Sequence, residues 1–412
     1  MSIIDNMKEH FLHIDIPLSA RQALSGLEPQ PQHEPDGDVV CWLLDTRNMW
    51  PGTNIYSASG AAACMSLVSL EEQNTIGTKM FIADAKMSLA SALLKRLFVS
   101  TALEIPWKEV QLARKGNEKH GKPCAVDDMG RPIAGIDFNV SHQNGLVSLI
   151  GWNGRKQQLY SPTGHIMGIL SPLRGTNEIM VGVDIVCVNE RQSASNTIDI
   201  DGFDGWVDVY ESIFSDEERW SMKYDVDYVT LLDGTVLTSA EVGRHDRCLA
   251  RHTNLSVTTA AGRNLSFSSE LLIDAKLRRF YTYFCYKEAY IKLTGEALLA
   301  PWLRQLEFHN VRSPKPGVVA RCSSHGVWGE EVDDVEVKLE GRIVTDVKMK
   351  IQSYEEDFMI ATAIQGEIQN ISVPHFRKLD LERDILPFSV DQHHTASKSA
   401  PDVITPWERR YF

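Results

Sequence analysis

An almost uninterrupted apolar run, Val181–Val188 (VGVDIVCV), restricts the fold of this chain more than any other segment. Its length and composition are typical of a strand that is buried on both faces. Asp184 lies in its middle, and an unpaired buried carboxylate costs roughly several kcal/mol, so it requires a cation, hydrogen-bond donors or a proton. Asp184 is therefore either a metal or catalytic residue, or it belongs to a structural ion pair or a solvent-facing strand end.

A second carboxylate stands in the strongest helical pattern of the sequence, which runs from about residue 275 to residue 294 and is expected to end at Gly295. Four residues at four-residue intervals share one stripe of this helix: Phe280, Phe284, Glu288 and Lys292. The two charges form either an ordinary surface pair, worth only about 0.3–0.5 kcal/mol, or the edge of a pocket. The spacing alone favours the surface pair.

The remaining periodicity predicts an α+β protein. A further helix is expected over Phe81–Thr101. Strand patterns occur in Val39–Leu44, Phe138–Val140, Leu146–Gly151, Val335–Leu339, Ile343–Ile351 and Phe358–Ile364, the last three as an antiparallel meander. Because a helix precedes strands twice, at 81–151 and at 212–364, the order of elements suggests two similar halves.

Composition suggests where these halves begin and end. We expect an N-terminal half at 1–176, a C-terminal half at 177–375 and a polar, partly mobile tail at 376–412. Two segments, 190–211 and 225–272, are rich in Ser, Thr, Asn, Asp and Gly with weak periodicity, which indicates insertions or long loops. Between them, the sequence Ser-Asp-Glu-Glu at 215–218 resembles a capping box that opens a helix.

Charge and cysteine content disfavour several classes of function. The 412 residues carry 42 Lys and Arg against 55 Asp and Glu, a net charge of −13 that disfavours general nucleic-acid binding. The seven cysteines are scattered without a CxxC pair, so neither a disulfide framework nor a zinc ribbon is expected. No apolar run reaches the roughly 20 residues of a membrane helix, and the start lacks a signal-peptide pattern. We expect a monomeric, cytoplasmic protein.

One stretch, Lys79–Lys122, reverses the overall charge. It holds nine Lys and Arg against four acidic residues, a net charge of +5 within a chain of −13. The stretch is either a solvated helix face followed by a polar loop, or a local anion site, because a cluster of one sign concentrates electrostatic potential.

Two short polar motifs lie close to this stretch. Ser141-His142 is expected in a tight turn after a strand, where it either contacts a ligand or has no role. Adjacency alone makes no nucleophile–base pair, and the chain contains no G-x-S-x-G elbow. Gly121-Lys122-Pro123 lacks the spacing and context of a P-loop, and neither G-x-G-x-x-G nor H-E-x-x-H occurs.

The order of the motifs is more specific than any one of them. G-K-P at 121–123, F-N-V-S-H at 138–142, V-G-V-D-I at 181–185 and Y-K-E-A-Y-I-K at 286–292 follow one another along the chain. This series resembles the Sfp-type 4′-phosphopantetheinyl transferases, most closely the eukaryotic, fungal-like members. I-G-T-K-M-F-I-A-D-A-K at 76–86 is also similar to that family, so the resemblance covers roughly residues 70–310.

The resemblance implies an enzyme that moves the phosphopantetheine arm of coenzyme A onto a serine of a carrier-protein domain and releases adenosine 3′,5′-bisphosphate. It also implies two α/β halves related by pseudo-twofold symmetry, with coenzyme A and Mg²⁺, or Mn²⁺ in its place, between them. The partners it implies are acyl and peptidyl carrier domains of fatty-acid, polyketide and nonribosomal peptide synthases and of aminoadipate reductase, an enzyme of lysine biosynthesis. No nucleic acid or membrane partner is expected.

The motif matches imply a role for individual residues. Asp184 and Glu288 match the metal-binding acids, Glu288 also the proposed base, and Lys292 the lysine that acts on the phosphate. The implied coenzyme contacts are Ser141 and His142 at the nucleotide, Lys119 or Lys122 with Pro123 near the 3′-phosphate, Arg114, and Lys287 beside Lys292. Val186 stands where many bacterial members have a third acidic ligand, so a water is expected there.

Two other functions remain open from the sequence. A coenzyme A-dependent acyltransferase would need no divalent metal, so its activity would survive EDTA. A non-catalytic homologue would bind coenzyme A or carrier domains, although a dead enzyme is expected to have lost one of Asp184, Glu288 and Lys292, which this chain keeps.

Overall fold

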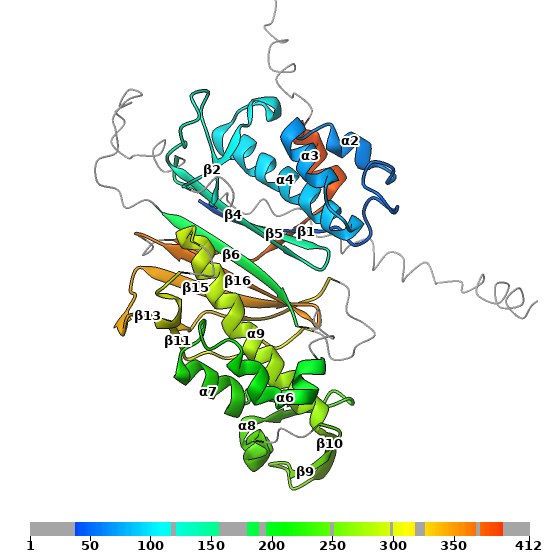
Figure 1. The fold of residues 1–412 in the computed structure, drawn as a ribbon, viewed down its shortest axis with the longest axis vertical. Helices are drawn as coiled ribbons and strands as arrows, with labels where there is room; N and C mark the ends of the chain where they lie inside the picture. Colours follow the sequence, from blue (N-terminus) through cyan, green and yellow to red (C-terminus); the bar gives the residue numbers. More distant parts are fainter. Residues whose placement is uncertain are drawn as a thin grey trace, which may run out of the picture. The chain divides into compact units, whose positions relative to one another are not determined.

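Two four-stranded sheets, each covered on one face by a long helix, organise the part of the chain that the structure describes (Figure 1). The computed structural model describes residues 38–116, 121–155, 179–188, 195–247, 251–296, 300–317, 326–367 and 371–389. These residues belong to one of the two units into which the chain divides, and the other unit, Met1–Gly37, lies outside them.

The first sheet has the strand order β17-β1-β5-β4. Its strands are β1 (Val39–Asp45), β4 (Ile136–Gln143), β5 (Leu146–Asn153) and β17 (Arg377–Leu379), and α4 (Ile82–Leu103) covers one face. Residues alternate along β1, with Leu44 packed beneath α4 and Leu43 in a core on the opposite face. The first strand and helix predictions are thus confirmed, with α4 beginning and ending within two residues of the expected bounds.

Short elements surround α4. They are α2 (Ala61–Met65), α3 (Leu70–Gly77), a 3-10 helix at Trp107–Glu109, and the pair β2 (Leu112–Arg114) and β3 (Pro123–Ala125). Ser69 and Glu72 form a capping box at the start of α3, and the same Glu72 carboxylate pairs with Arg96 of α4 at 2.5 Å. The packing of α3 on α4 is therefore fixed by charge as well as by apolar contact.

The second sheet has the order β12-β15-β16-β6, so β6 is an edge strand. Its strands are β6 (Met180–Cys187), β12 (Trp328–Val332), β15 (Val347–Tyr354) and β16 (Phe358–Gln365), and α9 (Ser269–Thr294) lies across β6 and β16. Gly182 lets the helix approach closely, because a Cβ there would collide with the backbone of α9 at Ala289. Gly295, with φ 78°, ends α9 as predicted, although the helix starts six residues earlier than expected, at Ser269.

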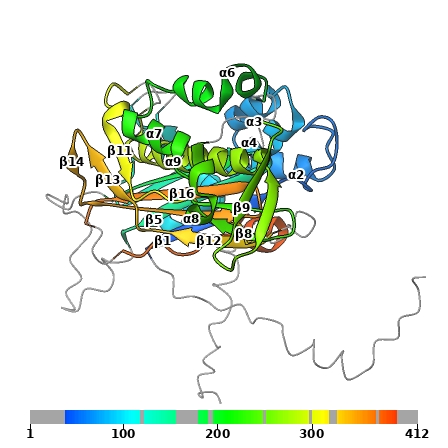
Figure 2. The same cartoon turned by 90° about the horizontal axis from the view of Figure 1, so that it is seen from below.

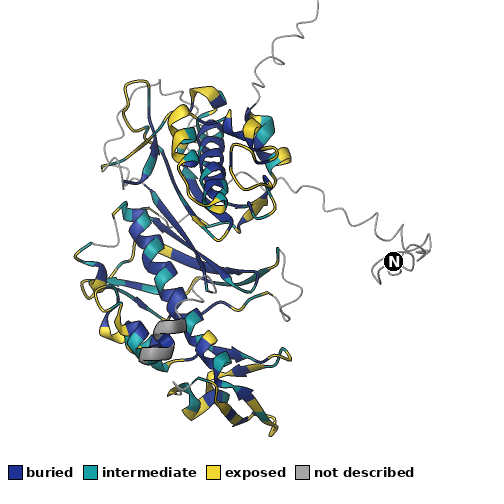
Figure 3. Ribbon diagram, turned by 45° about the vertical axis from the view of Figure 1, so that its right-hand side comes forward, coloured by how far each residue is buried: buried dark blue, intermediate teal, exposed yellow. Residues whose placement is uncertain are grey.

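Apolar residues from both sheets form a core between them, and both α4 and α9 are largely buried (Figure 3). Where the sheets meet, β4 lies beside the open edge of β6 without backbone pairing. Four alternate side chains of β4 accept hydrogen bonds from four alternate backbone N–H groups of β6: Asp137 from Val181 (2.9 Å), Asn139 from Val183 (3.4 Å), Ser141 from Ile185 (3.3 Å) and Gln143 from Cys187 (2.9 Å). We call these four contacts the β4–β6 ladder.

Of the two alternatives given for 190–211 and 225–272, insertions or long loops, the long-loop alternative was wrong for both segments, because each contains regular elements. Within the described residues, 190–211 contains α6 (Ser195–Asp208), and 225–272 contains β7 (Tyr228–Thr230), β8 (Val236–Thr238), α8 (Ser239–Val242), a 3-10 helix at Gly243–Arg247, β9 (Asn254–Thr258) and β10 (Asn264–Ser268). The two hairpins bury a small core of their own that includes Val229, Leu237 and Phe267. Short strands alternating with exposed Ser and Thr give too weak a periodicity to be recognised.

Helix α7 (Asp216–Tyr224) begins at the predicted capping box, with the Ser215 hydroxyl accepting from the Glu218 N–H. Figure 2 shows α9 between α7 and β16. The predicted three-strand meander is correct only for β15 and β16. The segment at 335–339 instead forms β13 (Glu336–Leu339), which pairs with β14 (Arg342–Ile343) and with β11 (Leu306–His309), the strand after a 3-10 helix at Leu303–Gln305.

Two further expectations need correction. The turn between β4 and β5 consists only of Asn144 and Gly145, which have φ 45° and 86°, so Ser141 and His142 lie on β4 and not in the turn. The expected polar tail returns to the first sheet, because β17 pairs in parallel with β1 and is followed by a π-helical turn at Leu381–Ile385 and α10 (Leu386–Ser389). Residues 390–412 lie outside the described part.

No helix among the described residues combines the length and apolarity needed to cross a bilayer. Within that part of the chain, Cys41, Cys64, Cys124 and Cys285 are buried free thiols.

The β4–β6 ladder generates a stability prediction. Asn139→Ala removes the acceptor of the buried Val183 N–H and should lower the free energy of unfolding by about 1–3 kcal/mol, because that donor is left without a partner. The matched control is Asn264→Ala, which removes an exposed strand amide that also accepts a hydrogen bond and should change stability by less than about 0.5 kcal/mol. Urea unfolding measures both, and equal losses would contradict a special role for the ladder.

Candidate active site

Two polar contacts stabilise the charge of Asp184 within its apolar strand. Its side chain is 7% exposed, and Oδ1 accepts hydrogen bonds from the Ser141 hydroxyl at 2.8 Å and from Lys292 Nζ at 2.6 Å. Ser141 lies on β4 and Lys292 on α9, so strands of both sheets and the long helix meet at this carboxylate. The alternative of a solvent-facing strand end is wrong, because Asp184 is buried and paired.

The helical stripe predicted from spacing lines a pocket beside Asp184. The pocket has a volume of about 240 Å³. It is lined by Ser141, His142, Gln143, Asp184, Ile185, Val186, Phe280, Tyr281, Phe284, Glu288 and Lys292. The interpretation of Glu288 and Lys292 as an ordinary surface pair is therefore wrong, since both line a pocket and the lysine pairs with Asp184 across the sheets.

The two carboxylates of the pocket influence each other. Burial, and then the negative charge of Asp184, raise the pKa of Glu288 to about 7, against a smaller opposing effect of Lys292. At the rim, loss of hydration and then the ammonium groups of Lys292 and Lys79 lower the pKa of His142. The pocket thus holds two acids that resist simultaneous ionisation, with cations close by.

This arrangement fits a divalent cation that has few protein ligands. Asp184 and Glu288 supply two carboxylates, and the described residues contain no group of three His, Cys, Asp or Glu side chains placed to hold a metal. Val186 also lines the pocket, so the position of an acidic third ligand is apolar. Mg²⁺ is commonly held by one or two carboxylates and completes its shell with water and phosphate oxygens.

Lys287 does not join this pocket, although it was expected beside Lys292. Its side chain is fully buried on a different face of α9, where Nζ lies 2.9 Å from Glu218 and donates to the carbonyl oxygen of Leu303 at 3.0 Å and to that of Leu306. Adjacent helical residues point about 100° apart. The expected coenzyme contact of Lys287 is therefore corrected to an internal ion pair.

Those predicted 3′-phosphate residues that the structure describes do not line the pocket either. Lys122 is 7% exposed, and its ammonium group pairs with Asp137 and donates to the carbonyl oxygen of Val181 at 2.7 Å. Pro123 lies on β3, and Arg114, on β2, is exposed and donates to the carbonyl oxygen of Gly121 at 2.8 Å. Lys119 lies outside the described residues.

Sequence reasoning did not identify two of the polar side chains that line the pocket. Gln143 contacts β6 through the β4–β6 ladder, and Tyr281 stands on the same side of α9 as Glu288. Gln143 could have been found from the alternation of β4, where polar residues occupy every second position from 137. No comparable signal marks Tyr281 within a helix that is aromatic on several faces.

Comparison with known proteins identifies the family. Residues 57–153 match the family model described as 4′-phosphopantetheinyl transferase, N-terminal. The chain is 57% identical to a 4′-phosphopantetheinyl transferase of Aureobasidium melanogenum over 351 residues, which cover 85% of this chain and 97% of that protein. It is 31% identical to the 4′-phosphopantetheinyl transferase NpgA of Emericella nidulans over 84% of this chain and 92% of the relative.

A shorter similarity reaches a second group of relatives. The chain is 36% identical to the L-aminoadipate-semialdehyde dehydrogenase-phosphopantetheinyl transferase of Schizosaccharomyces pombe over 145 residues, which cover 35% of this chain and 46% of that protein. The resemblance inferred from the ordered motifs is confirmed by these matches. Over most of its length, this chain belongs to the 4′-phosphopantetheinyl transferase family, among its fungal members.

Proposed function

We propose that this chain transfers the 4′-phosphopantetheine arm of coenzyme A to a serine of carrier-protein domains, with Mg²⁺ as cofactor and adenosine 3′,5′-bisphosphate as the second product. Family membership supports the reaction class. The observation that carries the mechanism is the single pocket in which Asp184, Glu288 and Lys292 meet. The cytoplasm is the proposed location and the monomer the proposed state.

Asp184 and Glu288 would hold the metal ion. The mutual effect of the two carboxylates supports this, because the pKa of Glu288 is raised to about 7 partly by Asp184, and a cation between like charges relieves that conflict. A bound Mg²⁺ would neutralise negative charge on the pyrophosphate of coenzyme A and on the departing phosphate.

Lys292 would stabilise charge on the phosphate that is transferred. Its Nζ already lies 2.6 Å from Asp184 and 2.7 Å from the Ser141 hydroxyl, at the wall of the pocket. An ammonium group placed where charge develops in the transition state acts without reorganising solvent. Glu288 lines the same pocket and is the residue proposed to take the proton of the attacking carrier serine.

The nucleotide of coenzyme A would extend over Ser141 and His142 toward the basic stretch. His142 lines the pocket, and loss of hydration, then the charge of Lys292 and then that of Lys79 from the basic stretch lower its pKa. Arg114 is exposed on β2 and belongs to the basic stretch, so we assign it to the 3′-phosphate. Lys122 is not assigned to the coenzyme because its ammonium group pairs with Asp137.

The two halves would be related by pseudo-twofold symmetry. A long helix over a four-stranded sheet, α4 in one case and α9 in the other, supports this relation. The partners proposed are acyl and peptidyl carrier domains of fatty-acid, polyketide and nonribosomal peptide synthases, and aminoadipate reductase. The last is suggested by the name of the relative from Schizosaccharomyces pombe.

The central test is mass spectrometry of an apo carrier domain incubated with the protein, coenzyme A and Mg²⁺. The expected result is the mass gain of one phosphopantetheine on a serine, and its loss in EDTA. Glu288→Gln should reduce the rate by about 100-fold or more, because it removes both a metal ligand and the base. Glu270→Gln, on the same helix outside the pocket, is the control. Acyl transfer that persists in EDTA would refute the proposal.

Glu288→Gln should also increase the stability of the protein at alkaline pH. Glu288 has an ordinary pKa of 4.5 and a folded-state pKa of about 7, so between these values the folded state holds the additional proton and the free energy of unfolding falls as pH rises. In EDTA, the free energy of unfolding of Glu288→Gln should therefore exceed that of the wild type by up to about 3 kcal/mol at pH 8. Near pH 4.5 the difference in this free energy should be much smaller. Urea unfolding at both pH values measures this, and a pH-independent difference would contradict it.

Arg114 provides a test of the nucleotide site. Arg114→Ala should raise KM for coenzyme A by about 3- to 10-fold with little change in kcat, because a ground-state contact is lost. The effect should disappear with a coenzyme that lacks the 3′-phosphate. Arg131→Ala removes an exposed arginine of the segment between β3 and β4 and should leave KM unchanged. An equal effect on both forms of the coenzyme would refute the assignment.

A further inference from the structure

We propose that the buried ion pair between Lys287 and Glu218 is a positioning device, which fixes the rotation of α9 about its axis and thereby the direction of Glu288. The two side chains are 0% and 2% exposed, and Lys287 Nζ lies 2.9 Å from Glu218 Oε2. Lys287 directly precedes the proposed base in the chain. This inference rests on the proposed function.

Lys287 attaches α9 to the segment that leads into β11. Its ammonium group donates to the backbone carbonyl oxygens of Leu303, at 3.0 Å, and of Leu306, in addition to its contact with Glu218. The Phe214 and Phe308 rings lie 5.3 and 6.0 Å away and exclude water. All three N–H donors of the lysine thus have protein acceptors.

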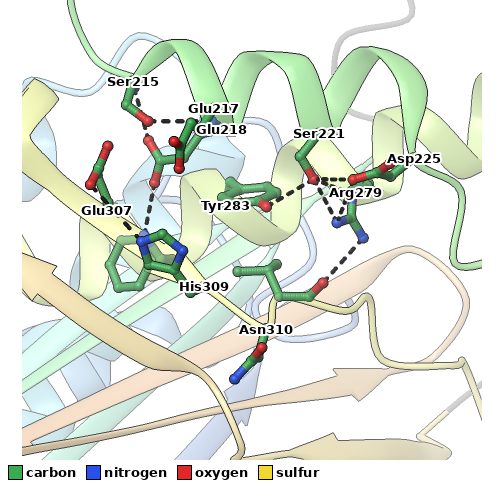
Figure 4. A pocket seen from close by; sticks show the side chains of 12 residues that line it. Ser215, Glu217, Glu218, Ser221, Asp225, Arg279, Tyr283, Glu307, His309 and Asn310 are labelled. Atoms are coloured by element: carbon green, nitrogen blue, oxygen red, sulfur yellow. Dashed lines mark hydrogen bonds and ion pairs between the residues drawn. The ribbon is translucent and has the colours of Figure 1, made fainter. Parts of the chain in front are cut away.

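Glu218 connects the same lysine to α7. Its Oε2 accepts from the Ser215 N–H at 3.0 Å, and its Oε1 accepts from the Phe308 N–H at 3.1 Å. Figure 4 shows the Glu218 side chain beside Ser215 at the start of α7. One pair of charges therefore joins the start of α7, the C-terminal half of α9 and the strand β11.

The stability of the fold does not by itself explain why a buried ion pair occurs at this position. Two charges lose their hydration on burial, and apolar residues of similar volume often replace a buried ion pair without loss of stability. Directed hydrogen bonds to three elements instead specify one rotation of the helix, which apolar packing specifies less sharply. Because adjacent residues of a helix point about 100° apart, fixing Lys287 against α7 and β11 directs Glu288 into the pocket with Asp184.

The close contact at Gly182 complements this device. Gly182 sets how near α9 lies to β6, since any side chain there would push the helix backbone away. Close approach does not by itself prevent rotation of the helix about its own axis. The Lys287–Glu218 pair supplies that restraint at the residue next to Glu288.

A second buried lysine of this protein is a matched control. Lys350 on β15 is 7% exposed, pairs with Glu331 at 3.0 Å and donates to the carbonyl oxygens of Val373 and Pro374, both at 3.1 Å. Its partners are thus one carboxylate and two backbone oxygens, as for Lys287. It lies outside the pocket that contains Glu288.

The experiment compares Lys287→Met with Lys350→Met in the full-length protein, at a temperature where unfolding curves show both to be folded. Steady-state transfer to an apo carrier domain gives kcat and KM for coenzyme A, and electron paramagnetic resonance with Mn²⁺ and coenzyme A gives metal affinity. Lys287→Met should lower kcat by about 10-fold or more and weaken Mn²⁺ binding by about 5-fold, with KM changed by less than about 3-fold. Lys350→Met should leave all three within about 2-fold, and Lys287→Arg should recover most of kcat.

Wild-type kcat and Mn²⁺ affinity in folded Lys287→Met, or equal losses in the two lysine variants, would overturn the inference. If Lys287→Met does not fold, Glu218→Asp tests the same point, because it keeps the charge and withdraws the carboxylate by one methylene. A folded Glu218→Asp variant with unchanged kcat and metal affinity would equally overturn it. Absence of transfer by the wild type would instead refute the proposed function.

Discussion

The β4–β6 ladder is the contact on which the rest of this structure depends. An edge strand exposes unpaired backbone donors, and here four side chains of β4 take the place of a neighbouring strand for β6. The ladder joins the two sheets and also reaches the active site, because the Ser141 hydroxyl accepts from Ile185 and donates to Asp184. The same hydroxyl therefore joins the two sheets and positions the proposed metal ligand.

Three buried or half-buried lysines of this structure each pair with an acidic residue. Lys122 pairs with Asp137, Lys287 with Glu218 and Lys292 with Asp184. Lys292, unlike the other two, faces a pocket that also contains a second carboxylate, Glu288. Lys292 is thus placed to contact a phosphate bound beside the two acids, whereas Lys122 and Lys287 hold backbone carbonyl oxygens as well as their acids.

Helices and strands with a strong apolar periodicity were predicted well, and those with a weak periodicity were predicted poorly. The helices α4 and α9 and the strands β1, β6, β15 and β16 were all expected, because long apolar patterns determine which faces are buried. The hairpins β7–β8 and β9–β10 were missed, since each strand has only three to five residues and half of them face water. The Asn144-Gly145 turn was placed too early, which put Ser141 and His142 outside the strand that positions them.

The sequence alone determined the family, the buried strand with its single acid and the helical stripe that carries Glu288 and Lys292, because these depend on residue order and local spacing. That this strand lies at the edge of its sheet was decided by the tertiary structure. The sequence did not determine which of several lysines reaches the pocket. Lys287 stands in the same motif as Lys292, and Lys122 stands in the G-K-P motif. Their partners Glu218 and Asp137 come from other parts of the chain. Only tertiary structure decides such pairings. A charge on the surface is hydrated wherever it lies, whereas a buried charge needs a partner that the fold brings next to it.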